Sequence, residues 1–234
     1  MINSQSIDVW VYRPSECDAD EAFLRSKLSS DDIIRANTLS SPSRFIKQRA
    51  ALRQILSRYC DTSPQEITLS RTKEGKPFVA RSSLQFSISH SHNLWLCAVS
   101  GATTSLGVDL EIIKKPRDIS SIVTRYFAED EIALFAKLPT SQQCAFFYSR
   151  WTLKEAFLKA VGCGIAGGLD NLTIYETGAQ SHAKISPPFL QQHQLSAASW
   201  QFYYQRLSHN SHFAACYQSE SGCDLEYKNF SFAS

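Results

Sequence analysis

The chain has 234 residues, of which 43% are hydrophobic, 12% aromatic and 20% charged, and its formal net charge is +2. This composition is typical of a globular protein with a substantial core, and the length allows one large domain or two small ones. Basic and acidic residues are interspersed, which excludes the broad positive field of a nucleic-acid-binding protein. We therefore expect no nucleic-acid partner.

The sequence also bears on membrane insertion, secretion and the state of the cysteines. No apolar run approaches the ~20 residues needed to span a bilayer, so we expect no membrane association. The first five residues lack the basic and apolar regions of a signal peptide. The seven cysteines form neither a CxxC pair nor a zinc-like spacing, a pattern that favours reduced thiols. The sequence predicts a cytoplasmic protein.

In the first part of the chain, hydrophobic periodicity predicts a strand, three helices and three further strands, in that order. The expected ranges are 7–12 for the first strand, then 19–28, 31–39 and 42–59 for the helices, then 66–70, 84–89 and 94–100 for the strands. The third helix has a proline in its first turn, where helices tolerate it.

The second part repeats this order. Its expected ranges are 105–113 for the strand, then 118–125, 128–137 and 141–161 for the helices, then 172–175, 200–206 and 212–217 for the strands. The offset is about one hundred residues, and such regular recurrence indicates an internal repeat of elements. A chance order of elements in one α+β domain is the alternative.

The repeat predicts an α+β fold of two similar α/β halves in a pseudo-two-fold arrangement, with the active site at their interface. In each half a strand, helices, a long helix and antiparallel strands follow one another. We expect an N-terminal half at 1–103, on the side that binds nucleotide and phosphate. The C-terminal half, 104–234, would carry the metal-binding carboxylates and the catalytic helix.

The expected strand at 105–113 contains two acidic residues on one face. Side chains at i and i+2 of a strand point the same way, ~6.6 Å apart, so Asp109 and Glu111 project together while Leu110 turns inward. Two carboxylates in this arrangement suit Mg²⁺. Taken alone, the pattern is more often a solvated polar face.

The helix expected at 141–161 carries a third acidic residue. At ~100° per residue its apolar positions share one face, and Lys154, Glu155 and Lys159 fall on the other. Glu155 and Lys159 could form an ordinary surface ion pair. They could also meet a metal and a diphosphate.

A third segment offers groups that bind anions. Lys76 lies between a turn glycine and a proline (Gly75-Lys76-Pro77), which holds the lysine on a stiff loop. Ser89 and His90 supply hydroxyl and imidazole donors at a strand end. Serine and histidine in loops are usually turn residues, so this segment alone decides nothing. The sequence contains no nucleophile elbow, P-loop, HExxH or dinucleotide fingerprint.

In combination these segments resemble the 4'-phosphopantetheinyl transferase superfamily, in particular its single-chain, surfactin-synthetase-activating (Sfp) type. The segments that carry the resemblance are Gly75-Lys76-Pro77, Phe86-Ser87-Ile88-Ser89-His90-Ser91, Gly107-Val108-Asp109-Leu110-Glu111, and Trp151-Thr152-Leu153-Lys154-Glu155-Ala156 through Lys159 and Gly162. Ser87 departs from the family pattern, which often has asparagine there. The resemblance spans about a third of the chain, from 75 to 162.

The resemblance implies a role for each matching residue. Asp109, Glu111 and Glu155 would hold Mg²⁺ against the diphosphate of coenzyme A, with Glu155 also the base. Lys154 and Lys159 would neutralise the diphosphate as catalytic cations. The residues expected to bind the nucleotide end and its phosphates are Lys76, Pro77, Ser89, His90 and, less firmly matched, Arg49.

The implied activity is transfer of 4'-phosphopantetheine from coenzyme A to a serine of an apo acyl or peptidyl carrier protein, or of a carrier domain, by a monomer. Two alternatives stay open. One is a non-catalytic coenzyme A-binding relative, and the other is a Mg²⁺-dependent enzyme that hydrolyses the diphosphate. The sequence does not indicate which carrier or pathway is served, and the region after about residue 176 carries no recognised motif.

Overall fold

The computed structural model describes residues 6–113 and 118–232. The short segment 1–5, considered above as a possible signal, lies outside them. Contacts divide the described residues into two compact units. Unit 1 comprises 6–71, 77–102 and 223–232, and unit 2 comprises 72–76, 103–113 and 118–222. One boundary between the units lies between Ala102 and Thr103. The last segment of the chain, however, belongs to unit 1 rather than to the second half.

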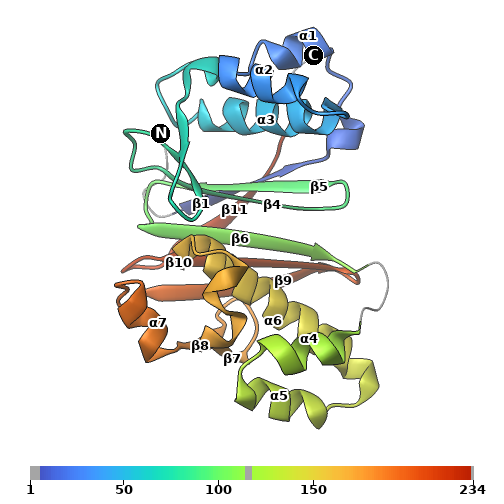
Figure 1. Cartoon of the computed structure of the whole chain (residues 1–234), viewed down its shortest axis with the longest axis vertical. Coiled ribbons are helices and arrows are strands. Elements are labelled where there is room, and N and C mark those ends of the chain that lie inside the picture. Colours follow the sequence, from blue (N-terminus) through green and yellow to red (C-terminus); the bar gives the residue numbers. More distant parts are fainter. Residues whose placement is uncertain (1–5, 114–117, 233–234) are drawn as a thin grey trace. The chain divides into compact units, whose positions relative to one another are not determined.

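Unit 1 is a mixed sheet covered by helices (Figure 1). Its elements are β1 (Ser6–Tyr12), α1 (Glu21–Arg25), α2 (Ser30–Asn37), α3 (Ser43–Leu56), β2 (Leu69–Arg71), β3 (Pro77–Val79), β4 (Gln85–Ser91), β5 (Leu94–Ser100) and β11 (Asp224–Asn229), with short 3₁₀ turns at Pro14–Glu16 and Pro64–Glu66. The main sheet has the order β11-β1-β5-β4, in which β11 runs parallel to β1 and the other neighbours are antiparallel. The apolar side chains of α3 pack on this sheet in a core that includes Leu52, Leu56 and Trp95.

Unit 2 has the same plan. Its elements are β6 (Ser105–Ile112), α4 (Ile119–Tyr126), α5 (Glu129–Ala136), α6 (Thr140–Val161), β7 (Leu172–Glu176), β8 (His182–Ile185), α7 (Pro187–Gln192), β9 (Trp200–Ser208) and β10 (Ser211–Gln218), with 3₁₀ turns at Ile165–Gly167 and Leu169–Asn171. The sheet is antiparallel with the order β6-β10-β9. The long helix α6 packs on it through Leu153, Ala156 and Phe157.

The two units therefore share one topology, each taken by itself. In both, the first strand pairs antiparallel with the last strand of a closing hairpin: β1 with β5, and β6 with β10. In both, a long helix precedes a small two-stranded sheet, β2-β3 or β7-β8. This confirms the α+β class and the repeated order of elements. The strands β3, β8 and β11 and the helix α7 were not predicted.

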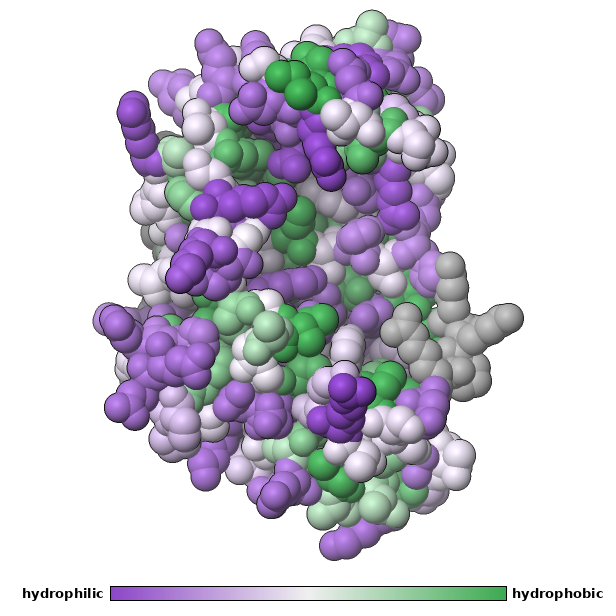
Figure 2. All heavy atoms as spheres, in the orientation of Figure 1, coloured by the Kyte–Doolittle hydropathy of each residue, from purple (hydrophilic) through white to green (hydrophobic). Residues whose placement is uncertain are grey.

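None of the described helices combines the length and apolarity needed to cross a membrane. On the face shown in Figure 2, hydrophobic residues are interspersed with hydrophilic ones. Single exposed apolar residues of this kind are normal on protein surfaces.

Candidate active site

The three predicted metal-binding carboxylates, those of Asp109, Glu111 and Glu155, lie where β6 meets α6. Gly107, Asp109 and Glu111 follow one another on one face of β6. A Cβ atom added to Gly107 would lie 2.0 Å from the carbonyl oxygen of Ala156 and 2.3 Å from the backbone nitrogen of Ala160. Because only glycine leaves that space open, the backbone of α6 approaches the strand closely at this point. The face with the two acidic residues is thus the face that α6 covers.

Two hydrogen bonds connect the helix to these acids. Lys159 Nζ lies 2.7 Å from Asp109 Oδ1, and the Asp109 side chain is almost buried. The indole nitrogen of Trp151 donates to Glu111 Oε1 over 3.1 Å. Trp151 had no predicted role. Trp151 lies two helical turns before Lys159 and therefore on nearly the same side of α6. This spacing is the sequence feature that could have predicted its contact with an acidic residue of β6.

Glu155 lies between these two contacts along α6. Within the described ranges its Oε1 is buried and has no hydrogen-bond partner. Burial raises the pKa of Glu155 to about 7; the negative charge of Asp109 adds to this, Lys159 opposes it, and Glu111 adds a further increase. Asp109 and Glu111 are therefore close enough to affect the ionisation of Glu155. A carboxyl group with this pKa can hold or release a proton near neutral pH.

The oxygen donors on β6 and α6 are of the kind that a hard divalent cation prefers. In the part of the chain that the structure describes, no three His, Cys, Asp or Glu side chains are already gathered into a metal-binding arrangement. The buried Glu155 oxygen without a partner, beside two further carboxylates, is nevertheless the feature that a cation would satisfy. The carboxylate oxygens of Asp109, Glu111 and Glu155 are therefore donors of the type that Mg²⁺ prefers.

Lys154 does not lie on the polar face of α6, so that prediction is wrong. Its side chain is 0% exposed, and Nζ lies 2.7 Å from Glu131 Oε2. The same ammonium donates to the backbone carbonyls of Leu169, over 2.8 Å, and Leu172. Three acceptors use its three donors. Lys154 ties α6 to the first turn of α5 and to the start of β7, and it has no donor left for a substrate phosphate.

Lys76 belongs to unit 2, by way of the loop 72–76. Its Nζ donates to the carbonyl oxygens of Ala160, over 2.6 Å, and Leu106, over 3.2 Å. Burial lowers the pKa of Lys76 to about 8, against a smaller opposite effect of Cys216. The ammonium group of Lys76 thus already binds two backbone groups.

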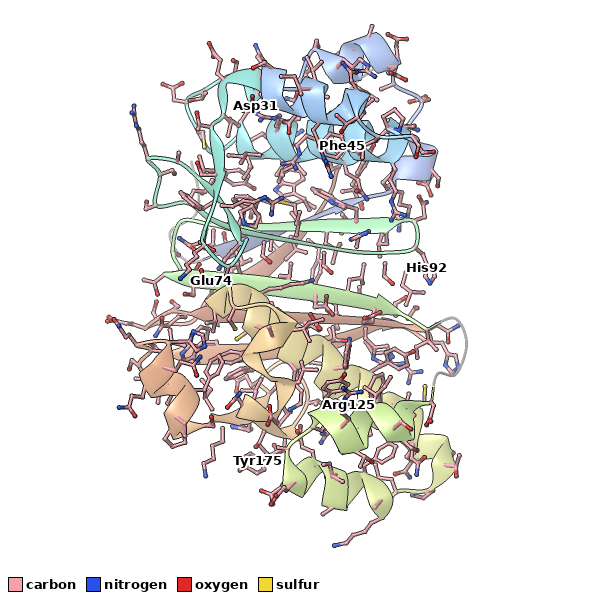
Figure 3. The ribbon with its side chains drawn as sticks, viewed as in Figure 1. Asp31, Phe45, Glu74, His92, Arg125 and Tyr175 are labelled. Atoms are coloured by element: carbon pink, nitrogen blue, oxygen red, sulfur yellow. The ribbon has the colours of Figure 1, made fainter. Side chains whose placement is uncertain are left out.

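The remaining predicted residues belong to unit 1. Arg49 and Pro77 line a cavity of about 270 Å³ beside α2, whose position is marked by Asp31 in Figure 3. Arg49 Nε lies 3.3 Å from Asp32 Oδ1. Burial lowers the pKa of Arg49, while Asp32 acts in the opposite direction. Arg71 lines the same cavity and was missed by the sequence analysis. Arg71 directly precedes the turn that ends at Lys76. A second basic residue beside that turn was the sequence feature that could have drawn attention to it.

Ser89 and His90 lie near the end of β4 and do not line this cavity. Ser89 is 5% exposed, whereas His90 is exposed. As consecutive residues of a strand they point to opposite faces of the sheet. The prediction that residues of both halves form one site stays a prediction.

A model of the 4'-phosphopantetheinyl transferase superfamily matches residues 105–217. The 4'-phosphopantetheinyl transferase HetI of Nostoc sp. is 37% identical over 170 residues, which cover 70% of this chain and 71% of HetI. The chain belongs to this superfamily. Within the superfamily, it is also 33% identical to slr0495 of Synechocystis sp. over 189 residues, 73% of this chain and 76% of that protein. To the 4'-phosphopantetheinyl transferase Sfp of Bacillus subtilis it is 30% identical over 125 residues, 53% of this chain and 54% of Sfp.

The match to the superfamily model covers the β6–α6 site. Asp109, Glu111, Glu155 and Lys159 all lie inside it. Arg49, Lys76, Ser89 and His90 lie before the matched range, and their expected contacts with the nucleotide stay predictions.

Proposed function

We propose that this superfamily member transfers the 4'-phosphopantetheine group of coenzyme A to a serine hydroxyl of an apo carrier protein. The observation that carries the proposal is the arrangement of Glu155, Asp109 and Lys159 where α6 crosses β6. It combines the carboxylate of Asp109, the ammonium of Lys159 and the carboxyl group of Glu155, which ionises near neutral pH. The Lys159 ammonium can contact a diphosphate, and the Glu155 carboxylate can receive a proton.

In the proposed step the serine oxygen attacks the β-phosphoryl group of coenzyme A. A new phosphorus–oxygen bond forms, and the phosphoanhydride bond to the α-phosphate breaks. The electron pair leaves with 3',5'-ADP, and the serine proton passes to Glu155. Lys159, which lies beside Asp109, offers positive charge to the diphosphate.

We further propose that Asp109, Glu111 and Glu155 hold a Mg²⁺ ion. The ion would supply positive charge to the diphosphate oxygens. Trp151 orients Glu111 through its indole N–H, and Lys159 orients Asp109. Both contacts limit the movement of the carboxylates before substrate arrives. Lys154 is left out of this site because its donors are used in the interior.

A direct test incubates the protein with coenzyme A, MgCl₂ and an apo carrier protein and follows the intact mass of the carrier. We expect the carrier to gain one phosphopantetheinyl group, and Asp109→Ala and Glu155→Ala to abolish the gain. Glu176→Ala, which removes an exposed carboxylate at the end of β7, should leave the rate unchanged. Coenzyme A binding without any mass gain would instead indicate a non-catalytic relative. Release of free phosphopantetheine in the absence of carrier would indicate a hydrolase.

We also propose that the protein acts as a monomer in the cytoplasm. All seven cysteines are free thiols, which supports a reducing compartment. Each unit contains its own core and sheet, so folding needs no second copy. Light scattering coupled to gel filtration would test the oligomeric state, and cell fractionation the location.

A further inference from the structure

The ammonium group of Lys76 joins two elements of unit 2 that carry the candidate catalytic side chains. It donates to Ala160 O of α6 and to Leu106 O of β6. Ala160 follows Lys159 directly, and Leu106 lies three residues before Asp109. The two acceptors are therefore backbone groups next to the site rather than side chains within it.

The acceptor on α6 lies in the last turn of that helix. The last four carbonyl groups of a helix have no partner within it, and a cation beside them also interacts favourably with the helix dipole. The helix ends at Val161 and is capped by Gly162, whose φ of 91° is left-handed and whose N–H donates to Leu158 O over 2.8 Å. Lys76 thus satisfies a carbonyl that the helix itself leaves without a donor.

The aliphatic part of Lys76 is held just as closely. A Cβ atom added to Gly162 would lie 3.1 Å from Lys76 Cδ. The loop that presents the lysine is a compact turn, marked by Glu74 in Figure 3. In it, Thr72 N donates to Lys76 O over 2.9 Å and Lys76 N donates to Thr72 Oγ1 over 3.2 Å. The lysine is anchored at both ends of its side chain.

The same end of α6 is where the helix and β6 are closest, because Gly107 leaves room for the backbone of Ala156 and Ala160. A shift of the last turn of α6 would move Lys159 directly and Glu155 one turn earlier. Asp109 lies on β6, which Lys76 contacts through Leu106 O. The contacts of Lys76 therefore limit how far Glu155 and Lys159 on α6 can move relative to Asp109 on β6.

We propose that Lys76 is a positioning residue that clamps the C-terminal end of α6 to β6 and so sets Glu155 and Lys159 against Asp109. This proposal rests on the proposed function and gives Lys76 a role distinct from that of a phosphate ligand. One of its three N–H groups remains after the two carbonyls are bound. A phosphate contact would thus add to the clamp and not replace it.

The test uses Lys76→Met, which keeps the aliphatic chain and removes the donors. Lys73→Met is the matched control, since Lys73 is an exposed lysine of the same loop. Hydrogen exchange of the amides around 158–162 comes first. We expect about 10-fold faster exchange in Lys76→Met, because a charged hydrogen bond at the helix end is lost, and no change in the control. Unchanged exchange in Lys76→Met would overturn the clamp.

The second measurement compares kcat and KM for coenzyme A and for 3'-dephospho-coenzyme A. A clamp predicts that kcat falls by about 10- to 100-fold and by the same factor for both donors, because misplaced catalytic groups affect either substrate. A rise in KM confined to coenzyme A would show that Lys76 binds the 3'-phosphate, and unchanged kcat would also overturn the proposal. Lys76→Arg, which keeps charge and donors, should restore part of kcat and covers the case in which Lys76→Met does not fold. If the wild-type protein transfers nothing, the proposed function fails, while the exchange experiment still tests the clamp.

Discussion

Two lysines of α6, five residues apart, have very different surroundings. Lys154 is fully buried against Glu131, whereas the Lys159 side chain is about one-third exposed and pairs with Asp109. A buried ion pair is sensitive to loss of one partner, because the other charge remains without compensation. A pair that water reaches is worth much less to folding. The same residue type is therefore structural in one position and available for chemistry in the other.

Lys154→Met should lower the free energy of unfolding by about 3 kcal/mol, since the buried Glu131 loses its nearer cation and keeps Arg150, whose Nε lies 3.9 Å from Oε1. Lys159→Met should change it by about 1 kcal/mol or less and abolish most of the transfer activity. Urea unfolding followed by circular dichroism measures the first quantity, and the carrier mass assay the second. Equal losses of stability in the two variants would contradict this division of roles.

The ionisation of Glu155 predicts a dependence of stability on pH. Because its pKa is raised in the folded state, the folded protein keeps the proton where the unfolded chain releases it. The cost of the buried carboxylate is absent below the ordinary glutamate pKa, grows as pH rises, and is complete above about 7. Removing the charge should therefore help only at the higher pH.

We expect Glu155→Gln to gain about 1 to 2 kcal/mol of stability relative to wild type between about pH 5 and about pH 8 in the presence of EDTA. Excess Mg²⁺ should reduce the difference, because a bound cation compensates the carboxylate of the wild type. Urea midpoints at the two pH values measure this. A stability difference that does not depend on pH would contradict the assigned pKa.

At the scale of elements, the contact between β6 and α6 depends on one missing methyl group. The space that a Cβ of Gly107 would need is occupied by backbone, which cannot rotate away as a side chain can. An added methyl must push the whole helix from the strand. Stability and the spacing of the acids should therefore change together.

Gly107→Ala should lower stability by about 1–3 kcal/mol and reduce kcat by about 100-fold, through displacement of Glu155 and Lys159. Gly178→Ala is the matched control, since a Cβ there would meet nothing within 4 Å. Thermal unfolding and the carrier assay provide the two measurements. Wild-type activity in Gly107→Ala would show that the close approach of α6 is not required.

At the scale of the whole chain, the order of elements could be predicted from periodicity, whereas some of their partners could not. The segment 105–113 alternates between polar and apolar residues, which predicted the strand, and the spacing of Asp109 and Glu111 predicted that both acids lie on one face of it. The burial of Lys154 depends on Glu131, which lies on another helix, and a helical projection considers one helix alone. β11 has the sequence Asp-Leu-Glu-Tyr-Lys-Asn, with few apolar residues, and its partner β1 is more than two hundred residues earlier. Pairing at such a separation leaves no local signal.

Within unit 1, β11 is joined to β1 by a charged contact as well as by backbone hydrogen bonds. Lys228 Nζ lies 2.7 Å from Asp8 Oδ2, and Asp8 also accepts a hydrogen bond from Tyr59 OH. Lys228→Met should lower the stability of unit 1 by about 1 kcal/mol, because the nearly buried Asp8 loses its cation. Lys184→Met, at an exposed lysine of another short strand, is the control. Hydrogen exchange in β1 gives the local reading, and equal protection in both variants would contradict this role.

The pairing of β11 with β1 has a consequence during synthesis on the ribosome. Apart from the short loop 72–76, the residues of unit 2 form an uninterrupted stretch that emerges before β11 does. Unit 2 can therefore finish folding before β11 is available to complete the sheet of unit 1. Until the final strand emerges, the edge of β1 stays open and is a place where other strands could attach. A pause in translation that delays β11 would therefore lengthen the time for which the edge of β1 is open to other strands.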